Sequence, residues 1–175
     1  MKARRPALRI RSAIRRDAPA ILALIRGLAE YEHLEHELEA TIARLRLHGF
    51  GRRRYFETLL CLDGKRPVGF ALYFFTYSTF LARPTLYLED LFVVADARGR
   101  GAGKALLGAL AHIAGRRGCG RMEWAVLEWN TPAIGFYERL GARLRRDWIL
   151  TRLTGESLKR LSRTGEPDRF HHRSR

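Results

Sequence analysis

The sequence predicts one domain of the α/β class, and three observations support this. The chain has 175 residues, of which 46% are hydrophobic, so it can build one core but is too short for two comfortable domains. Segments with strand character alternate with segments whose apolar residues recur at helical spacing. The apolar run at residues 86–94 leads through a glycine-rich turn into a helical pattern, which indicates a strand, a loop and a helix.

The N-terminal third predicts a strand and two helices. Residues 7–12 alternate apolar and basic side chains, as a half-buried strand does. Asp17 is placed to cap a helix that follows. The apolar face of this helix consists of Ala18, Ile21, Leu22, Ile25, Leu28 and Ala29. Residues 41–48 predict a short second helix, which Gly49 and Gly51 end.

The middle of the chain predicts a β-hairpin before the strand at residues 86–94. Residues 55–62 and 67–75 have strand character, and the intervening sequence Asp-Gly-Lys-Arg is typical of a turn. We expect residues 76–84 to form a loop. The helix after the central strand has one apolar face, formed by Ala102, Leu106, Ala109, Leu110 and Ile113.

The C-terminal third predicts a further strand and two helices. Residues 121–127 have strand character, and a helix starts at Asn-Thr-Pro 130–132, where the missing N–H of proline costs nothing. Residues 143–153 predict two short strands, and residues 156–161 predict a final short helix. We therefore place one domain at residues 7–162 and expect residues 163–175 to be a disordered basic tail.

The central strand and the loop after it are the first candidates for chemistry. Two carboxylates, Glu89 and Asp90, interrupt the apolar run, and charges are rarely placed in a sheet without a partner or a function. The sequence Arg-Gly-Arg-Gly-Ala-Gly-Lys at residues 98–104 precedes a helix, whose unpaired N–H groups favour a phosphate. Lys104 and Leu106 exclude a dinucleotide fingerprint, and Arg98 and Ala105 exclude a Walker loop.

The chain is strongly basic, with 33 Lys and Arg against 18 Asp and Glu and a net charge of +15. Such a charge suggests a polyanionic partner, but it also fits a basic bias of the whole surface or affinity for an anionic cofactor. We do not expect nucleic acid as a partner, because the arginines form no single block with interleaved aromatic residues.

One segment reverses this charge. Residues 30–39 contain five acids and no Lys or Arg. The segment is either a solvated helix end or a wall that attracts a cationic substrate.

The remaining composition favours a cytoplasmic protein without a metal. Cys61 and Cys119 lie far apart and lack metal-type spacing, and neither has a neighbouring His that would activate it as a nucleophile. The histidines show no helix-face metal pair, and we expect His33 and His36 to be solvated. We expect no secretory signal and no membrane span, because charged residues and Pro6 interrupt the N-terminal apolar pattern and no run is long enough.

Two motifs carry a resemblance to a known superfamily. The pattern Arg-x-x-Gly-x-Gly at residues 98–103 resembles the acyl-CoA pyrophosphate loop of the GNAT N-acetyltransferases. Residues 128–142, EWNTPAIGFYERLGA, are similar to the second cofactor motif of the same superfamily. The segments LAEYEHLE, YFFTY, YLEDLFV and FYERLGA resemble the spermidine/spermine (diamine) N-acetyltransferase branch, and the resemblance covers residues 28–153.

The resemblance implies a mixed, mostly antiparallel sheet, flanked by helices and splayed between its fourth and fifth strands, with acetyl-CoA in the splay. The strands concerned are residues 86–94 and 121–127. The residues implied in cofactor binding are Leu91, Phe92, Val93, Arg98, Gly99, Arg100, Gly101, Ala102, Gly103, Lys104, Asn130, Ala133 and Tyr137.

The resemblance also implies the catalytic groups and the amine site. Tyr137 is the expected general acid for the leaving thiolate, with packing on the inner face of its helix as the alternative. A backbone N–H near Leu91 would stabilise the oxyanion. Glu89 is the expected base or relay for the ammonium proton, or else an anionic anchor. The expected substrate contacts are Tyr31, Glu32, Glu89, Asp90, Glu128 and Trp129.

We therefore predict an acetyl-CoA-dependent N-acetyltransferase for a small polyamine, diamine or lysine-like amino acid. The charge of +15 weakens the case for spermine, because a basic surface repels polycations. One alternative acceptor is an amine of a protein or peptide. An alternative of another class is a nucleic-acid or ribosome-associated module, suggested by basic clusters at both ends and at residues 52–54. The resemblance also implies a homodimer formed through the C-terminal strands.

Overall fold

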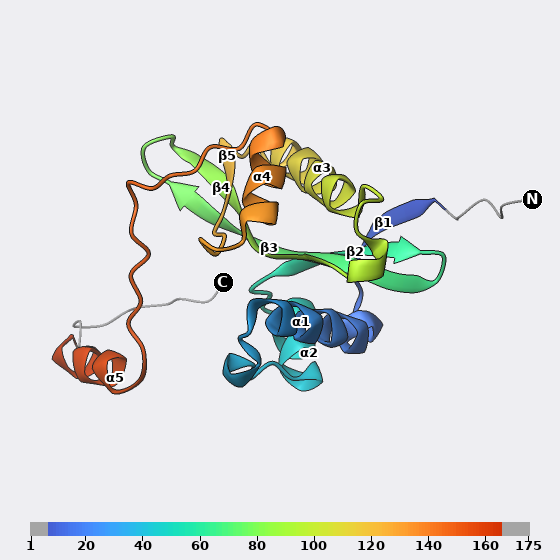
Figure 1. The fold of residues 1–175 in the computed structure, drawn as a ribbon. Helices are drawn as coiled ribbons and strands as arrows, with labels where there is room; N and C mark the ends of the chain where they lie inside the picture. Colours follow the sequence, from blue (N-terminus) through green and yellow to red (C-terminus); the bar gives the residue numbers. More distant parts are fainter. Residues whose placement is uncertain (1–6, 166–175) are drawn as a thin grey trace, which may run out of the picture. The chain divides into compact units, whose positions relative to one another are not determined.

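The computed structural model describes residues 7–165, which fall into two compact units that divide between Leu127 and Glu128 (Figure 1). The basic clusters expected at the two chain ends, and all but the first residues of the expected tail, lie outside the described residues. Within residues 7–165, no helix combines the length and apolar character needed to cross a membrane.

The first unit is built on a five-stranded sheet. Its strands are β1 (Leu8–Ser12), β2 (Glu57–Asp63), β3 (Arg66–Ser78), β4 (Arg83–Val93) and β5 (Arg121–Trp124), and they lie side by side in chain order. The first four pair antiparallel, while β4 and β5 pair parallel because α3 connects them. This confirms the mixed, mostly antiparallel sheet flanked by helices.

Helices cover both faces of this sheet. The helices α1 (Ala18–Glu32) and α2 (Ile42–Phe50) lie on one face, and α3 (Ala102–Arg116) lies on the other (Figure 1). The core on the α1 side joins buried residues of α1 and α2 to residues of β2, β3 and β4. These residues are Ala18, Ile21, Leu22, Leu24, Leu45, Leu60, Leu62, Phe70, Leu72 and Phe92. The apolar faces that the sequence predicts for α1 and α3 therefore both pack on the sheet.

The two N-terminal helices begin in different ways. Thr41 caps α2, and its hydroxyl accepts a hydrogen bond from the Arg44 backbone N–H at 3.2 Å. Asp17 occupies the N-cap position of α1, as predicted, but its carboxylate turns away from the helix. It accepts two hydrogen bonds from the Arg11 guanidinium, at 2.6 and 2.9 Å, and one from the Ile14 N–H. The bidentate ion pair is stronger than a neutral cap bond, and it lowers the pKa of Asp17.

The connection before β4 is shorter than predicted. Residues 76–84 were expected as a loop, but β3 continues to Ser78 and β4 starts at Arg83, so only residues 79–82 remain as a turn. The prediction was wrong because Thr76 and Tyr77 pair with Thr85 and Pro84, which extends the ladder beyond the body of the sheet.

The second unit contains α4 (Thr131–Arg139) and α5 (Gly155–Thr164). The predicted start of α4 is confirmed, whereas the two strands predicted at residues 143–153 are absent from this described part of the chain. A strand needs a hydrogen-bonded neighbour, and Trp148, Ile149 and Leu150 instead stand exposed in an irregular segment. The helix predicted at residues 156–161 extends to Thr164.

Candidate functional site

The parallel pairing between β4 and β5 is short, and this leaves one edge of β4 open. The two strands pair only from Thr85 with Arg121 to Leu88 with Trp124. On its other side β4 stays paired with β3 as far as Val93. The β5-facing backbone groups of residues 89–93 therefore lack a strand partner and can bind a ligand. This is the splay expected between the fourth and fifth strands.

A β-bulge stands at the first open residue. Asp90 pairs with Leu72 and Leu88 pairs with Tyr73, so Glu89 is an extra residue without an opposite partner. A bulge re-aims the side chains around it. It lets Leu88 stay buried while the polar pair Glu89 and Asp90 is presented beside the end of α1.

Three carboxylates meet at this bulge. Burial, together with the charges of Glu89 and Glu32, raises the pKa of the Asp90 carboxyl to about 7. Burial also raises the pKa of Glu32, at the last residue of α1. We call Glu32, Glu89 and Asp90 the carboxylate cluster. It can bind a cation, and Asp90 can hold or release a proton near neutral pH.

Tyr87 extends the cluster toward β5. Its pKa is raised by burial and by the charges of Glu89 and Glu123. Glu123 lies opposite Tyr87 in the ladder between β4 and β5 and forms an ion pair with Arg121 at 2.9 Å. The electrostatic influence of Glu89 and Glu123 therefore extends along β4 as far as Tyr87.

The acidic segment at residues 30–39 was expected to be either a solvated helix end or a wall that attracts a cationic substrate, and its acids fall into both groups. The α1 helix ends at Glu32 because His33 adopts a left-handed conformation, with φ of 60°. Glu32 reaches the carboxylate cluster, while Glu35 and Glu37 are exposed and Glu39 pairs with Arg44 at 3.2 Å. Glu32 thus belongs to the carboxylate cluster, while Glu35, Glu37 and Glu39 are largely solvated.

The glycine-rich loop forms an anion-binding turn at the start of α3. Gly99 and Gly101 have φ values of 71° and 85°, which side chains with a Cβ rarely adopt. Nothing lies within 4 Å of where a Cβ would stand at either residue, so the backbone is open to a ligand. The helix begins at Ala102 without a side-chain cap among the described residues, and its first N–H groups are available for a phosphate.

The two arginines of this loop, Arg98 and Arg100, contact different parts of the first unit. The Arg98 Nε donates a hydrogen bond to the Val93 carbonyl at 2.9 Å, and the guanidinium lies 4.6 Å from the centroid of the Tyr31 ring. Arg100 instead turns back to Asp63 at the end of β2, with which it forms an ion pair. Its side chain therefore braces the loop, and its contact with the cofactor stays a prediction.

A second brace holds the start of the loop. Arg66, at the start of β3, donates two hydrogen bonds to Asp96, at 2.7 and 2.9 Å. The hairpin between β2 and β3 thus supports both ends of the turn that precedes α3.

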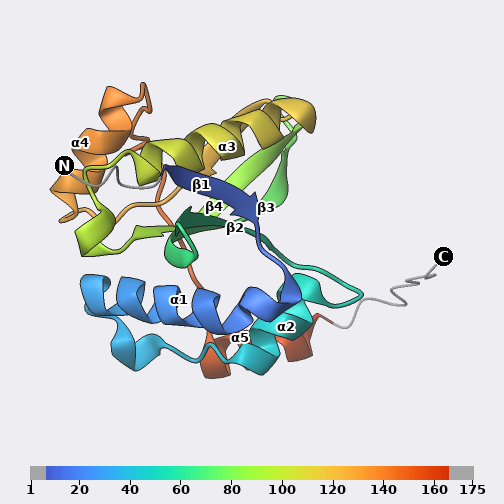
Figure 2. The same cartoon turned by 90° about the vertical axis from the view of Figure 1, so that its right-hand side faces the viewer.

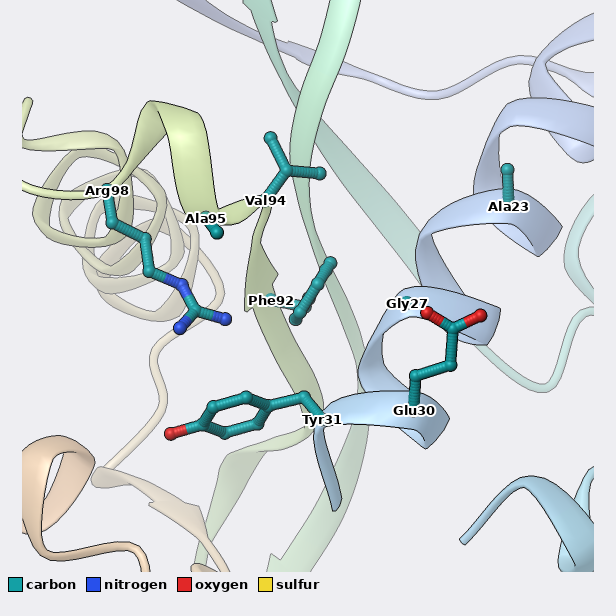
Figure 3. Close-up of a pocket in the computed structure, with 8 residues that line it drawn as sticks. All are labelled: Ala23, Gly27, Glu30, Tyr31, Phe92, Val94, Ala95 and Arg98. Atoms are coloured by element: carbon teal, nitrogen blue, oxygen red, sulfur yellow. The ribbon is translucent and has the colours of Figure 1, made fainter. Parts of the chain in front are cut away.

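A groove of about 470 Å³ runs between α1 and the end of β4 (Figure 3). Figure 3 shows the Arg98 guanidinium pointing toward Tyr31, with Phe92 between β4 and α1. The groove is lined by Ala23, Gly27, Glu30, Tyr31, Phe92, Val94, Ala95 and Arg98. It therefore joins Tyr31, an expected substrate contact, to Phe92 and Arg98, which were expected at the cofactor.

The other predicted site residues lie in the second unit. Asn130 is buried and caps α4, and its side chain accepts a hydrogen bond from the Ala133 N–H at 3.3 Å. Tyr137 is the buried residue of α4, and its ring lies 5.4 Å from that of Phe136. Glu128 pairs with Arg146 at 3.7 Å, and Trp129 is half exposed. These contacts give Asn130 and Ala133 a structural role within α4.

Sequence reasoning missed two features of the first unit. It placed Glu89 as a proton relay or an anionic anchor and Asp90 as a substrate contact, and it did not anticipate that burial raises the pKa of Asp90 to about 7. It also did not anticipate that Arg98 stacks on Tyr31. The sequence shows Glu89 and Asp90 as adjacent carboxylates in a strand. Only the bulge and the burial of the folded chain distinguish one from the other. Within the described part of the chain, no group of three His, Cys, Asp or Glu is arranged to hold a metal ion.

The chain matches a known family over most of its length. The profile of the acetyltransferase (GNAT) family matches residues 18–142. A thialysine N-epsilon-acetyltransferase of Mus musculus is 36% identical over 165 residues, which cover 88% of this chain and 96% of the mouse protein. An L-ornithine N5-acetyltransferase of Arabidopsis thaliana is 45% identical over 95 residues, which cover 54% of this chain and 42% of the plant protein.

Solved structures show the same fold. An integron cassette protein from the mobile metagenome of V. cholerae superposes with a TM-score of 0.75 at 26% identity, covering 89% of this chain and 97% of that protein. An aminoglycoside acetyltransferase from an uncultured soil sample has a TM-score of 0.71 at 18% identity, covering 84% of this chain and 95% of the other. The second likeness concerns the fold alone.

Proposed function

The chain belongs to the acetyltransferase (GNAT) family, and from this premise we propose that it transfers an acetyl group from acetyl-CoA to a primary amine of a small polyamine, diamine or lysine-like amino acid. Relatives named for thialysine, ornithine and spermidine/spermine support a small amine as acceptor. The observation that carries the proposal is the carboxylate cluster, which stands where the open edge of β4 begins.

The residues of the first unit fit acetyl-CoA. The unpaired backbone at Leu91, Phe92 and Val93 suits the amide groups of a pantetheine arm, and the open turn at residues 99–104 suits a pyrophosphate. Acetyl-CoA supplies an acetyl thioester as acyl donor. We assign the Arg98 side chain to the same site. Its guanidinium packs over the Tyr31 ring, and a ligand bound in the groove would contact both side chains.

The carboxylate cluster is our proposed amine site. Glu32 and Glu89 attract the ammonium group, and Asp90 takes up its proton, because an amine with a pKa near 10 attacks only when neutral. Tyr31 provides a ring face at the entrance of the groove. We retain Glu128 and Trp129 of the second unit as further substrate contacts.

Tyr137 is our proposed general acid, which protonates the thiolate that leaves. Its support is the match of residues 128–142 to the second family motif and the burial of its side chain on α4. We propose that Asn130 and Ala133 form the N-terminal end of α4 against the cofactor. A backbone N–H near Leu91 remains our candidate for stabilising the oxyanion.

The wider assignments are also proposals. We place the catalytic domain at residues 7–162 and propose a cytoplasmic enzyme, since neither Cys61 nor Cys119 is in a disulfide. A homodimer is supported by the exposed side chains of Trp148, Ile149 and Leu150, which a second copy would cover. Light scattering of the wild type and of Ile149→Asp tests this, and a monomeric wild type would exclude it.

The function is tested by thiol release from acetyl-CoA with a panel of acceptors: thialysine, lysine, ornithine, putrescine, spermidine, spermine and a peptide N-terminus. We expect release with the amino acids and diamines and little with spermine. Release with the peptide alone would replace the small-amine assignment by a protein acceptor. No release with any amine, despite measurable binding of CoA, would contradict the proposed acceptor class but not the cofactor site.

A further inference from the structure

Arg15 and Arg46 are linked near the N-terminal end of α1, and three more arginines follow in the loop after α2. Arg15 precedes α1, Arg46 lies in α2, and residues 52–54 form the loop between α2 and β2. The Arg15 Nη1 donates a hydrogen bond to the Arg46 carbonyl at 3.4 Å. Figure 2 shows α2 beside the N-terminal half of α1. We call Arg15, Arg46, Arg52, Arg53 and Arg54 the arginine patch.

An exposed aromatic ring is fixed beside these arginines. The Tyr55 N–H donates a hydrogen bond to the His48 carbonyl at 2.8 Å, which ties the loop to the end of α2. The rings of Tyr55 and His48 lie 5.3 Å apart, and the Arg53 guanidinium lies 5.4 Å from the Tyr55 centroid. Tyr55 nevertheless remains 57% exposed, so part of its ring is open to a ligand.

The positive charge of the patch is not neutralised locally. Within residues 7–165, none of its five arginines forms an ion pair with a carboxylate, while the neighbouring acids Asp17 and Glu39 are paired with Arg11 and Arg44. Like charges gathered in this way repel one another and weaken the fold slightly. A phosphate-bearing partner would remove that repulsion.

We propose that the arginine patch and Tyr55 form a binding site for single-stranded nucleic acid. Arginine binds phosphate oxygens with two parallel N–H groups, which lysine cannot do, and every side chain of the patch is arginine. An exposed tyrosine among such arginines offers a stacking platform for a base. A membrane surface fits less well, because Leu47 is the exposed large apolar side chain of α2 and one such residue is too little for interfacial anchoring.

From the sequence we did not expect nucleic acid, because the arginines form no single block with interleaved aromatic residues. In the structure Arg15 bonds to the backbone of Arg46, and Arg53 packs against Tyr55 in the loop that follows α2. The 15 residues of α1 place the patch about 20 Å from Glu32 at the other end of that helix. Binding at the patch therefore leaves the carboxylate cluster accessible.

The test is fluorescence anisotropy of a labelled 12-nucleotide single-stranded RNA with the full chain, over a series of salt concentrations. We expect the triple variant Arg52→Gln, Arg53→Gln, Arg54→Gln to bind at least tenfold more weakly at low salt. Its plot of log affinity against log salt should be shallower by about 2, since each lost phosphate contact removes about 0.7 from the slope. Acetyl transfer by the triple variant should equal that of the wild type, which shows that it is folded.

A matched control distinguishes RNA binding at this site from attraction to the net positive charge of the chain. The triple variant Lys159→Gln, Arg160→Gln, Arg163→Gln removes the same charge from the exposed helix α5 and should lose less than threefold. Equal losses in the two triple variants would overturn the proposal, because binding would then follow net charge alone.

A second pair of variants tests the aromatic contact. Tyr55→Ala should weaken RNA binding about tenfold, and Tyr55→Phe should preserve it, because stacking needs the ring and not the hydroxyl. Heparin and vesicles of anionic lipid serve as competitors. If either displaces the RNA at equal charge concentration, or if Tyr55→Ala binds like the wild type, the patch is a general anion surface and the assignment to nucleic acid is wrong.

Discussion

The two ends of α1 carry opposite charge and are built in different ways. At the C-terminal end, Glu32 meets two carboxylates of a bulged strand in a partly buried setting, where a pKa is shifted. At the N-terminal end, the arginine patch is largely exposed, and none of its described members forms an ion pair with a carboxylate. Burial strengthens interactions between charges, whereas salt screens exposed ones. The carboxylate cluster at the partly buried end can therefore accept and release protons, whereas the exposed arginine patch can only bind anions.

The largest effect should come from removing Tyr137, the proposed general acid. Tyr137→Phe should lower kcat by a factor of about 10² to 10³, since general acid catalysis contributes that much, and should leave the dissociation constant of acetyl-CoA within threefold. Steady-state kinetics and calorimetry measure the two quantities. Phe136→Leu is the control for packing on α4. If Phe136→Leu and Tyr137→Phe are equally impaired, Tyr137 has a packing role only.

Asp90→Asn should lower kcat/KM for the amine about tenfold at pH 8. It should also remove the rise of kcat/KM with pH that is centred near pH 7, because the Asp90 carboxyl has a pKa of about 7. The variant keeps the shape of the side chain and abolishes its titration. If the wild-type profile shows no inflection near pH 7, or if Asn leaves it unchanged, another group accepts the proton. Glu89→Gln is the comparison, and we expect it to raise KM and retain the profile.

The same carboxyl predicts the pH dependence of stability. The pKa of Asp90 is about 7 in the folded chain and about 4 when unfolded, so between these values the native state binds one more proton. The free energy of unfolding should therefore fall as pH rises from 5 to 7.5, by at most about 1.4 kcal/mol per unit. Asp90→Asn should lack this decline and be the more stable protein at pH 8. Urea unfolding at pH 5 and pH 8 measures the difference, and parallel curves would contradict it.

Neutralising one acid at one end of α1 and three arginines at the other should give unequal effects on amine binding. Glu32→Gln should raise KM for a diamine about threefold to tenfold, because Glu32 is close enough to shift the pKa of Asp90. The triple variant of residues 52–54 should leave KM for the diamine unchanged, because salt screens exposed charges at this distance. Initial rates at two ionic strengths test both. Equal and opposite changes in KM would mean that the long-range electrostatic field of the protein, and not local contact, controls binding of the amine.

A small effect should follow from loosening the turn that precedes α3. Arg66→Gln removes the two hydrogen bonds to Asp96 and should raise KM for acetyl-CoA about twofold to threefold without changing KM for the amine. Arg44→Gln breaks another exposed ion pair, with Glu39, and should change neither constant. A rise in the amine KM with Arg66→Gln would show that the brace acts on the carboxylate cluster instead.

The sequence by itself determined the elements and the chemical groups of the first unit. Periodicity located both long helices and the central strand, and the glycine pattern located the anion-binding turn. It could do so because apolar spacing and the need for positive φ at Gly99 and Gly101 are local properties of the chain. The acids of residues 30–39 and the pair Glu89 and Asp90 also stood out locally, as exceptions to a basic or an apolar background.

Only the tertiary structure decided what these groups do. Pairing with β3 creates the bulge that presents Glu89 and Asp90, and burial then distinguishes the two. Contacts between segments far apart in sequence turn Arg100 toward Asp63 and bring Arg15 to the backbone of Arg46. The strands predicted at residues 143–153 failed for the same reason, since a strand exists only where a neighbour completes its hydrogen bonds. Pairing, burial and long-range contact depend on the folded chain, and local pattern cannot specify them.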